Sequence, residues 1–570
     1  MADSSPSGSS AALKRYGPIL GVVLVVVVAV AVFGQGGNDK TDAPADDSQQ
    51  AREGLPLTFQ EAEADGIEGI EWGPGCDTET GRIAIPIHNA APCVEPPKAS
   101  DKGSGLATAP GVTSNSIKVI VYEGAPDPLQ QAIVGAAGAD TSPADTSQAT
   151  VDYLRLLEDT YQTYGRTLDI EVVTATGGAA DATAALADAR TIIDKKPFAV
   201  IGGPAQTPVY WQELTDAKIL CVGGCSLAEG WDNVDAAAPY LWPTAIAPEQ
   251  ADQHLLELVG KQLVGKPAKY AGDKALQKKE RVFGWIQAET ETGEYKARND
   301  EFDRRLEKDY DGKVVARSTY LFDLAAAQET ATSVVTRMKD NGVTTVLLSV
   351  DPLIPATITR EATKQGYFPE WVIGPSVLAD TTIFGRTFDQ KQWAHAFGIS
   401  LPPARADNDL SDAFGLYQWY FGKEAPTNTV DVILPGPAQL MLGIHLAGAD
   451  LNPNSFEQGM FRYPANAGGK TYTHVSWGNA LWDRPDHNSS DDAGVIWWNP
   501  TATGEDEPGN PGTGMMSYVD GGTRYLPGQW PTEPLPLFEE EGAVTFYTAV
   551  PPGEALPDYP AWPGSPAAKG

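Results

Sequence analysis

The loops expected after several strands of this chain carry small polar side chains that could hold a ligand by hydrogen bonds. Two of these loops contain glycine pairs, Gly202-Gly203 and Gly223-Gly224, which would let the backbone approach a ligand closely. The amides that follow begin expected helices, whose N-termini favour a carboxylate or another anion. The glycines have a second explanation, since a turn from a strand into a helix needs them in any case. We predict ligand contacts at Gln206, Thr207, Cys225, Ser226, Thr292, Asp351 and Ser376.

The four cysteines form two pairs along the sequence. Cys76 and Cys93 flank the segment GRIAIPIHNAAP, and a disulfide between them would close a small loop. The alternative is two unpaired thiols. Cys221 and Cys225 lie four residues apart in KILCVGGCS, where either a tight disulfide or two buried thiols would fit. No histidine lies near enough in sequence to favour a metal site at this second pair.

Residues that could support catalysis or bind a metal are scattered. We find no G-x-S-x-G, H-E-x-x-H or G-x-x-x-x-G-K-[ST] motif. The acidic run Glu505–Glu507, with Asp491 and Asp492 nearby, lacks the spacing of a calcium loop and is interpreted as a solvated loop. We therefore predict a chain with no metal, no cofactor and no enzymatic activity. The histidines without metal-ligand spacing are His88, His254, His395, His445, His474 and His487.

The charge balance limits the partners of the chain. Its 570 residues include 41 basic and 75 acidic side chains, which gives a formal charge of −34. This excess argues against a nucleic-acid partner, because phosphate binding needs a basic face. Hydrophobic residues make up 42% and charged residues 20%, so we expect a largely globular chain that contains several domain-sized units.

One apolar segment near the N-terminus predicts a membrane association. Residues 16–33 carry no charge and as a helix would reach about 27 Å, enough to cross a hydrocarbon core. Lys14 and Arg15 precede the segment, so the positive-inside rule places residues 1–15 in the cytoplasm and the bulk of the chain outside. The segment is either an uncleaved anchor or, with Ala29-Val30-Ala31 as a cleavage site, a secretory signal peptide. Both alternatives permit disulfides.

From Ile117 to Trp498, short apolar runs alternate with amphipathic helical stretches. The strand IKVIVY (117–122) and the helix 181–194, with Ile192 and Ile193 inward, typify a first set. A second set begins after Trp242. Strands that alternate with helices of ten to fifteen residues indicate parallel sheets covered on both faces. The sequence therefore predicts an α/β fold with two tandem doubly wound parallel-sheet lobes and an N-terminal transmembrane helix.

This order of elements resembles a type 1 periplasmic substrate-binding protein of the kind that serves branched-chain amino acid ABC importers. The resemblance rests on NSIKVIVY, on DARTIIDKKPFAVIGGPAQTPVYWQELTDAKILCVGG, on YLWPTAIAPEQADQHLLELV and on ATSVVTRMKDNGVTTVLLSVDPLIPATITREATKQGY. It implies two lobes that close over a ligand about a hinge. The expected divisions are a cytoplasmic segment 1–15, an anchor 16–33, an acidic tether with a Cys-flanked extension 34–115, lobe 1 at 116–243, lobe 2 at 244–401, a return to lobe 1 at 402–493, and a final strand with a Pro-rich extension at 494–570.

The resemblance implies a solute-binding role in which a small polar ligand, an amino acid or a related molecule, passes to an ABC permease. The loop GGCSL and the pair Thr292-Gly293 depart from the amino-acid-binding pattern, which puts the amino-acid specificity in question. An occupancy sensor with no transporter is the alternative role, and an extracellular hydrolase is a third. The Pro-rich stretch 500–570 is expected to lie extended on the surface, or to bind a partner, through Tyr518, Tyr525, Trp530 and Phe546.

Overall fold

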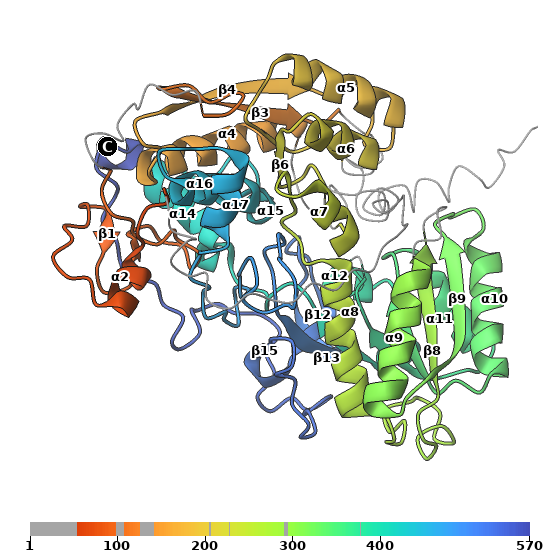
Figure 1. Ribbon diagram of the computed structural model, residues 1–570. Helices are drawn as coiled ribbons and strands as arrows, with labels where there is room; N and C mark the ends of the chain where they lie inside the picture. Colours follow the sequence, from red (N-terminus) through yellow and green to blue (C-terminus); the bar gives the residue numbers. More distant parts are fainter. Residues whose placement is uncertain are drawn as a thin grey trace, which may run out of the picture.

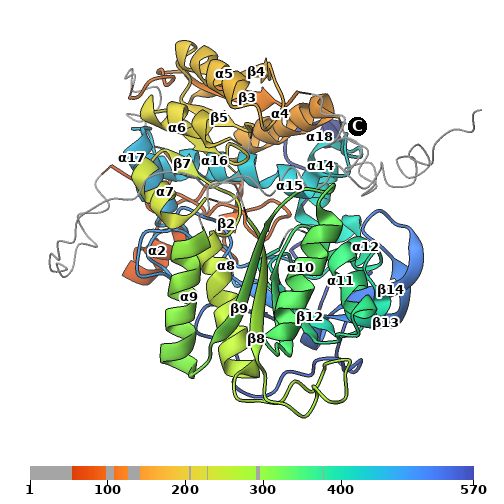
Figure 2. The same ribbon diagram turned by 90° about the vertical axis from the view of Figure 1, so that its right-hand side faces the viewer.

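Two mainly parallel β-sheets with helices on both faces form the body of the protein (Figure 1). The computed structural model describes residues 54–97, 108–125, 142–204, 207–226, 229–289, 295–376 and 378–569. The predicted membrane segment 16–33 lies outside these residues. We call the part built on the five-stranded sheet lobe 1 and the part built on the eight-stranded sheet lobe 2; Figure 2 shows them one above the other.

The five strands of lobe 1 are all parallel and lie in the order β4-β3-β5-β6-β7. Their bounds are β3 Ser116–Glu123, β4 Thr167–Thr174, β5 Ala199–Ile201, β6 Leu220–Val222 and β7 Leu241–Trp242. The helices of this lobe are α4 Pro143–Thr160, α5 Ala182–Asp194, α6 Pro208–Asp216, α7 Trp231–Ala237, α14 Asp412–Phe421, α15 Val430–Ile433, α16 Pro435–Ala447 and α17 Pro453–Met460.

The alternating side chains of β3 explain why helices cover both faces of this sheet. Ile117, Val119 and Val121 pack into one core together with α4 and α16. Ile120 and Tyr122 point to the opposite face and pack with α5 and α6. Because successive side chains of a strand point to opposite faces, an apolar run such as this one has to be covered twice.

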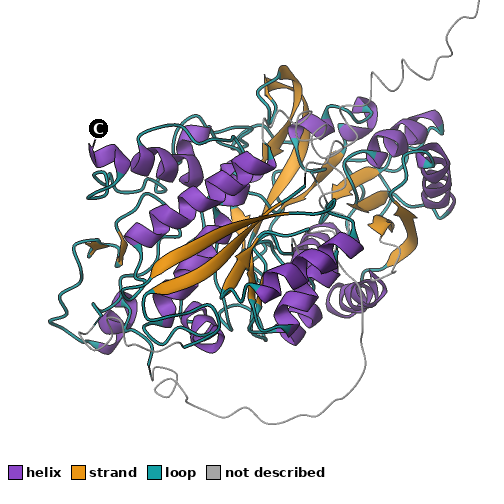
Figure 3. Cartoon of the chain, turned by 90° about the horizontal axis from the view of Figure 1, so that it is seen from above, coloured by secondary structure: helices purple, strands orange, loops and turns teal. Residues whose placement is uncertain are grey.

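Lobe 2 holds the strand order β14-β13-β12-β11-β10-β8-β9, with β15 paired to β13. The strands from β9 to β12 are parallel, and the pairings of β13 with β12, β14 and β15 are antiparallel. Figure 3 shows the strands in orange between purple helices. The strands are β8 Phe283–Glu289, β9 Val314–Leu321, β10 Thr345–Ser349, β11 Glu370–Ile373, β12 Ala396–Ser400, β13 Ala493–Glu505, β14 Pro511–Tyr518 and β15 Arg524–Tyr525. The helices are α8 Pro248–Glu257 with a π-helical turn Leu258–Leu263, α9 Tyr295–Tyr310, α10 Ala327–Asp340, α11 Ile354–Lys364, α12 Thr382–Gly385 and α13 Gln390–Trp393.

The mixed α/β fold with parallel sheets is the one that the sequence predicts. The prediction for the C-terminal stretch needs a correction, because β13 continues to Glu505 and pairs with β14 inside the lobe 2 sheet. Tyr518 and Trp530, expected as surface docking points, are buried, and the indole Nε1 of Trp530 donates to Nδ1 of His254 at 3.0 Å. Most of this stretch is therefore part of the lobe 2 core or packs against it.

The chain passes between the lobes four times. Residues 243–247 lead from β7 to α8, residues 401–411 from β12 to α14, and residues 461–492 from α17 to β13. After β15 the chain packs Leu535 and Leu537 into lobe 2 and then returns to lobe 1. There Trp419 Nε1 of α14 donates to the Tyr559 carbonyl at 3.0 Å, and the short helix α18 (Pro566–Lys569) ends the chain beside α14. We call residues 548–558 the C-terminal strap.

Both predicted disulfides are present. Cys76 and Cys93 join with a Cα–Cα distance of 5.6 Å, and Cys221 and Cys225 with one of 5.8 Å. The first pair lies in an extension on lobe 1 that holds α2 (Phe59–Asp65), β1 (Cys76–Asp77) and β2 (Arg82–Ile83). Ile83, Ile85 and Ile87 of this extension enter the lobe 1 core, so its Cys-flanked loop is part of the folded body.

One described stretch, Val430–Ala447, is long and apolar enough to cross a membrane by length and composition. It comprises α15 and α16, and 78% of its residues are buried inside the protein. Its apolar character is explained by burial, because α16 packs between the lobe 1 sheet and α17.

Candidate ligand-binding site

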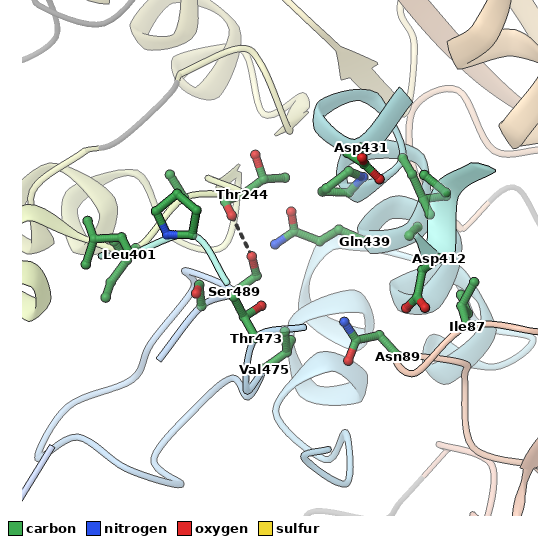
Figure 4. Close-up of a pocket in the computed structure, with 18 of the residues that line it drawn as sticks. Ile87, Asn89, Thr244, Leu401, Asp412, Asp431, Gln439, Thr473, Val475 and Ser489 are labelled. Atoms are coloured by element: carbon green, nitrogen blue, oxygen red, sulfur yellow. Dashed lines mark hydrogen bonds between the residues drawn. The ribbon is translucent and has the colours of Figure 1, made fainter. Parts of the chain in front are cut away.

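A cavity of about 560 Å³ lies where the chain crosses between the lobes (Figure 4). Three crossings contribute to its wall, lobe 1 contributes α14, α15 and α16, and lobe 2 contributes the segments after β11 and β12. The volume falls within the range of about 300–1,000 Å³ typical of small-molecule sites. We call this space the inner cavity. Its wall residues from the crossings are Thr244, Ala245, Ile246, Leu401, Pro402, Thr473, Val475, Trp477, Ser489 and Ser490.

The rest of the wall comes from the lobes and from the N-terminal extension. The extension places Ile87 and Asn89 at the cavity, so its folding onto lobe 1 completes the site. The lobe residues are Gly374, Ser376, Leu378, Asp380, Ile399, Asp412, Ala413, Asp431, Leu434, Pro435, Ala438, Gln439 and Leu442. Most of these side chains are aliphatic or small, and none of the residues lining the cavity is Lys, Arg or His.

Gln439 is the most deeply buried polar residue of the wall for which a hydrogen-bonding atom is left over. Its side chain is only 3% exposed and reaches toward the cavity from α16 (Figure 4). Nε2 donates to the Pro243 carbonyl at 3.4 Å, whereas Oε1 has no partner within the described residues. A buried acceptor without a donor costs about 1–3 kcal/mol, so Oε1 offers a ligand donor a favourable contact.

Three carboxylates also line the inner cavity, and each is held differently. Asp412 Oδ1 lies 2.7 Å from Nδ1 of His88. Asp380 accepts from the Ser400 hydroxyl at 3.1 Å, and burial raises the pKa of Asp380 to about 6. Asp431 accepts a hydrogen bond from the Ser411 hydroxyl.

A second, wider space of about 910 Å³ adjoins the first on the α14 side. Both spaces are lined by Asn89, Asp412, Asp431 and Thr473, so they meet at these four residues. We call this space the outer cavity. Its remaining wall includes the second crossing, where Asp407 and Asp409 lie, and the β13–β14 turn. The inner cavity is thus apolar and the outer one polar and acidic.

Of the seven residues predicted as ligand contacts, Ser376 lines the inner cavity. Its hydroxyl donates to the Leu348 carbonyl at 3.2 Å and accepts from the Val350 amide at 3.1 Å, so it also fixes the strand ends. Gln206 and Thr292 lie outside the described residues. The remaining four predicted residues do not line the inner cavity.

Each of those four residues has a place in the fold that explains it. Asp351 is fully buried: Oδ1 accepts from the amides of Leu353 and Ile354 at 2.8 Å, and Oδ2 accepts from the Tyr320 hydroxyl. Cys225 is bound in its disulfide. Thr207 precedes α6 and its hydroxyl donates to the Pro204 carbonyl at 3.3 Å, and Ser226 is buried.

The lobe 1 glycine loops pack against other backbone. The amide of Gly202 donates to the Gly223 carbonyl at 2.8 Å. Gly223 has φ of 45°, and a Cβ on it would lie 2.6 Å from Cα of Gly436 in α16. Glycine is therefore required here so that α16 can approach β6 closely, which is how α16 comes to line the inner cavity.

His88 ties the N-terminal extension to both α14 and the C-terminal strap. Its Nδ1 faces Asp412 Oδ1 at 2.7 Å, and its Nε2 faces the carbonyl oxygen of Glu554 at 3.0 Å. The ring stacks on Tyr472 with centroids 3.7 Å apart. Both ring nitrogens thus face acceptors, an arrangement that suits the protonated imidazolium. Burial opposes protonation, but the hydrogen bond and charge of Asp412 outweigh it and raise the pKa of His88 above its usual value.

Replacing His88 by glutamine is expected to cost stability in a pH-dependent way. A raised folded pKa means that the contribution of His88 is complete below the unfolded pKa of about 6.5 and is lost as pH rises through the folded pKa. The difference in free energy of unfolding between wild type and His88→Gln should therefore shrink as pH increases above about 6.5. Urea unfolding across this range measures it. Tyr472→Leu removes the stacking but no charge and should give a pH-independent loss; the same behaviour in His88→Gln would contradict the assignment.

No protein-family model matches this chain, and no curated protein matches it in sequence. Among solved structures, it is similar to a fatty acid ABC transporter substrate-binding protein from Thermomonospora curvata, with 16% identity over 72% of this chain and 94% of that one and a TM-score of 0.44. It is also similar to an amino acid ABC transporter substrate-binding protein from Pseudomonas fluorescens Pf-5, with 12% identity over 73% and 99% of the chains and a TM-score of 0.45.

A third similar structure is a solute-binding protein of an ABC transporter from Rhodopseudomonas palustris BisB5, in complex with 3,4-dihydroxy benzoic acid. It has 12% identity over 72% of this chain and 98% of that one and a TM-score of 0.45. At these scores the likeness decides nothing about ligand or role, and the two-lobe arrangement described here rests on the sheet order. The solved structures similar to this chain are substrate-binding proteins of ABC transporters, the class that its sequence resembles.

Proposed function

We propose that this chain is an extracytoplasmic solute-binding protein that takes a small, largely apolar molecule into the inner cavity and delivers it to an ABC importer. In this proposal residues 16–33 hold the protein at the membrane. The observation that carries it is the composition of the cavity wall, which draws on both lobes and on three crossings between them. A ligand there contacts every segment that a hinge rotation would move, so occupancy and lobe arrangement are coupled.

The wall chemistry favours an apolar molecule over a free amino acid. The α-carboxylate of an amino acid needs a cationic partner or several aligned donors, because a buried charge without them is costly. The inner cavity offers no basic side chain, and its three charged side chains are all acidic. Aliphatic residues such as Leu434, Leu442 and Ile399 instead supply surface that gains from burying an apolar ligand.

Native mass spectrometry of the full chain, extracted from membranes in mild detergent, tests this proposal. We expect a population heavier than the bare chain by the mass of one small molecule, which denaturation releases for identification. Cells that lack the chain should then take up that molecule more slowly. An empty chain, together with no thermal stabilisation by any member of a broad apolar compound panel, would contradict the proposed function.

A further inference from the structure

The meeting point of the inner and outer cavities has a marked charge bias. The outer cavity is lined by seven carboxylates and one basic side chain, Arg405. Arg405 is already engaged, since its Nε lies 3.6 Å from Glu507 and its Nη1 donates to the Glu505 carbonyl at 3.0 Å. The inner cavity adds Asp380 and no basic side chain. A ligand that spans both spaces therefore passes through a field of negative charge.

One carboxylate at the meeting point has no cationic partner within the described residues. Asp412 is paired with His88, but Asp431 has only the Ser411 hydroxyl as a printed neighbour. Asp431 lies on α15 and lines both cavities. It is therefore the acid best placed to receive a positive group from a ligand.

Gln439 supplies an independent indication that a donor is needed here. Its Oε1 is buried and has no partner among the residues that the structure describes, and it belongs to the helix that follows Asp431. Figure 4 shows Asp431 and Gln439 on the same side of the cavity. A ligand anion would meet repulsion from Asp431 and an acceptor that it cannot satisfy, whereas an ammonium or guanidinium group donates to both.

We infer that the ligand is an organic cation: its apolar part occupies the inner cavity, and its charged nitrogen lies at the meeting point, within reach of Asp431 and Gln439. This inference rests on the proposed function, because it specifies the ligand class of the same cavity.

Isothermal titration of the full chain with three probes that share one carbon skeleton tests the charge. The probes are phenylbutylammonium, phenylbutanol and phenylbutanoate. We expect the ammonium to bind at least about tenfold more tightly than the alcohol, and the carboxylate to bind most weakly, because a hydrogen bond to a charged group is stronger than a neutral one.

Two variants separate the contributions. Asp431→Asn should weaken ammonium binding by about tenfold and leave the alcohol nearly unchanged, whereas Gln439→Leu should weaken both donors. Asp409→Asn is the matched control, since it removes one charge from the outer cavity away from the meeting point and should change ammonium affinity by less than about twofold.

The outcomes distinguish the two proposals. If phenylbutanoate binds as tightly as phenylbutylammonium, or if Asp431→Asn leaves their ratio unchanged, the cationic ligand is wrong while the binding cavity stands. If no probe binds, the charge of the molecule found by native mass spectrometry decides: a cation supports the inference, and a neutral or anionic molecule overturns it. If no probe binds and the chain is also empty, the proposed function itself fails.

Discussion

Replacing Arg281 by methionine is expected to lower the free energy of unfolding by about 3–5 kcal/mol, the usual cost of leaving a buried charge without its partner. The side chains of Arg281 and Glu370 are 2% and 0% exposed. Nε donates to Glu370 Oε2 at 2.7 Å and Nη2 donates to Oε1 at 2.9 Å. The same carboxylate also accepts from the Thr345 hydroxyl and the Tyr270 amide, so it holds the start of two lobe 2 strands together.

Chemical denaturation of the full chain measures this loss. Lys296→Met in the same lobe is the matched control: the Lys296–Asp300 pair is 81% and 66% exposed, and its loss should cost no more than about 0.5 kcal/mol. The double variant Arg281→Met with Glu370→Gln removes the orphaned charge and should regain part of the stability. Equal losses for the buried and the exposed pair would show that the buried pair does not organise lobe 2.

Replacing Ala438 by tryptophan is expected to weaken ligand binding by at least about a hundredfold, because the indole would occupy volume that the ligand needs. Ala438 lies on α16 and faces the inner cavity. The cavity of about 560 Å³ has room for the larger side chain, so the fold itself should tolerate it. Native mass spectrometry should find the variant empty, with the thermal midpoint of the ligand-free chain nearly unchanged.

Val432→Trp provides the matched control for that experiment. Val432 is 80% exposed on α15 and lines neither the inner nor the outer cavity, so the same bulk is added nearby without filling the site. This variant should retain the small molecule. Retention in both variants would place the ligand elsewhere, for instance among the glycine loops of lobe 1.

The elements that could be predicted are those whose own residues carry the pattern. The apolar run of β3 and the spacing of Val334, Val335 and Met338 in α10 are local, and the structure has both elements within a residue or two of the expected bounds. The strand β14 was missed because Pro511 and two glycines obscure it. Its pairing with β13 depends on residues that a local pattern does not contain. Partners elsewhere in the chain decided that strand.

The site followed the same division. The rule that ligands lie beyond strand ends located Ser376, which follows β11. It missed Ile87, Gln439 and Asp431, because an extension and two helices far apart in sequence meet only after folding. The single signal available for Gln439 was a polar residue within an otherwise apolar helix, PGPAQLMLGIHLA. Asp351 was predicted for its polarity, but its oxygens are used to cap α11 and to pair with Tyr320.

The C-terminal strap has a consequence for the kinetics of exchange. The Glu554 carboxylate accepts from the amides of Lys470 and Thr471 at 2.9 and 3.2 Å, while Tyr547 exchanges backbone hydrogen bonds with Arg405 and Asp407 on the second crossing. Since this segment joins lobe 2 to lobe 1, any wide separation of the lobes requires some of these contacts to break. The dwell time of a bound molecule would then be governed by local unfolding of the strap, with the steep temperature dependence of an unfolding event, and affinity and residence time could vary independently.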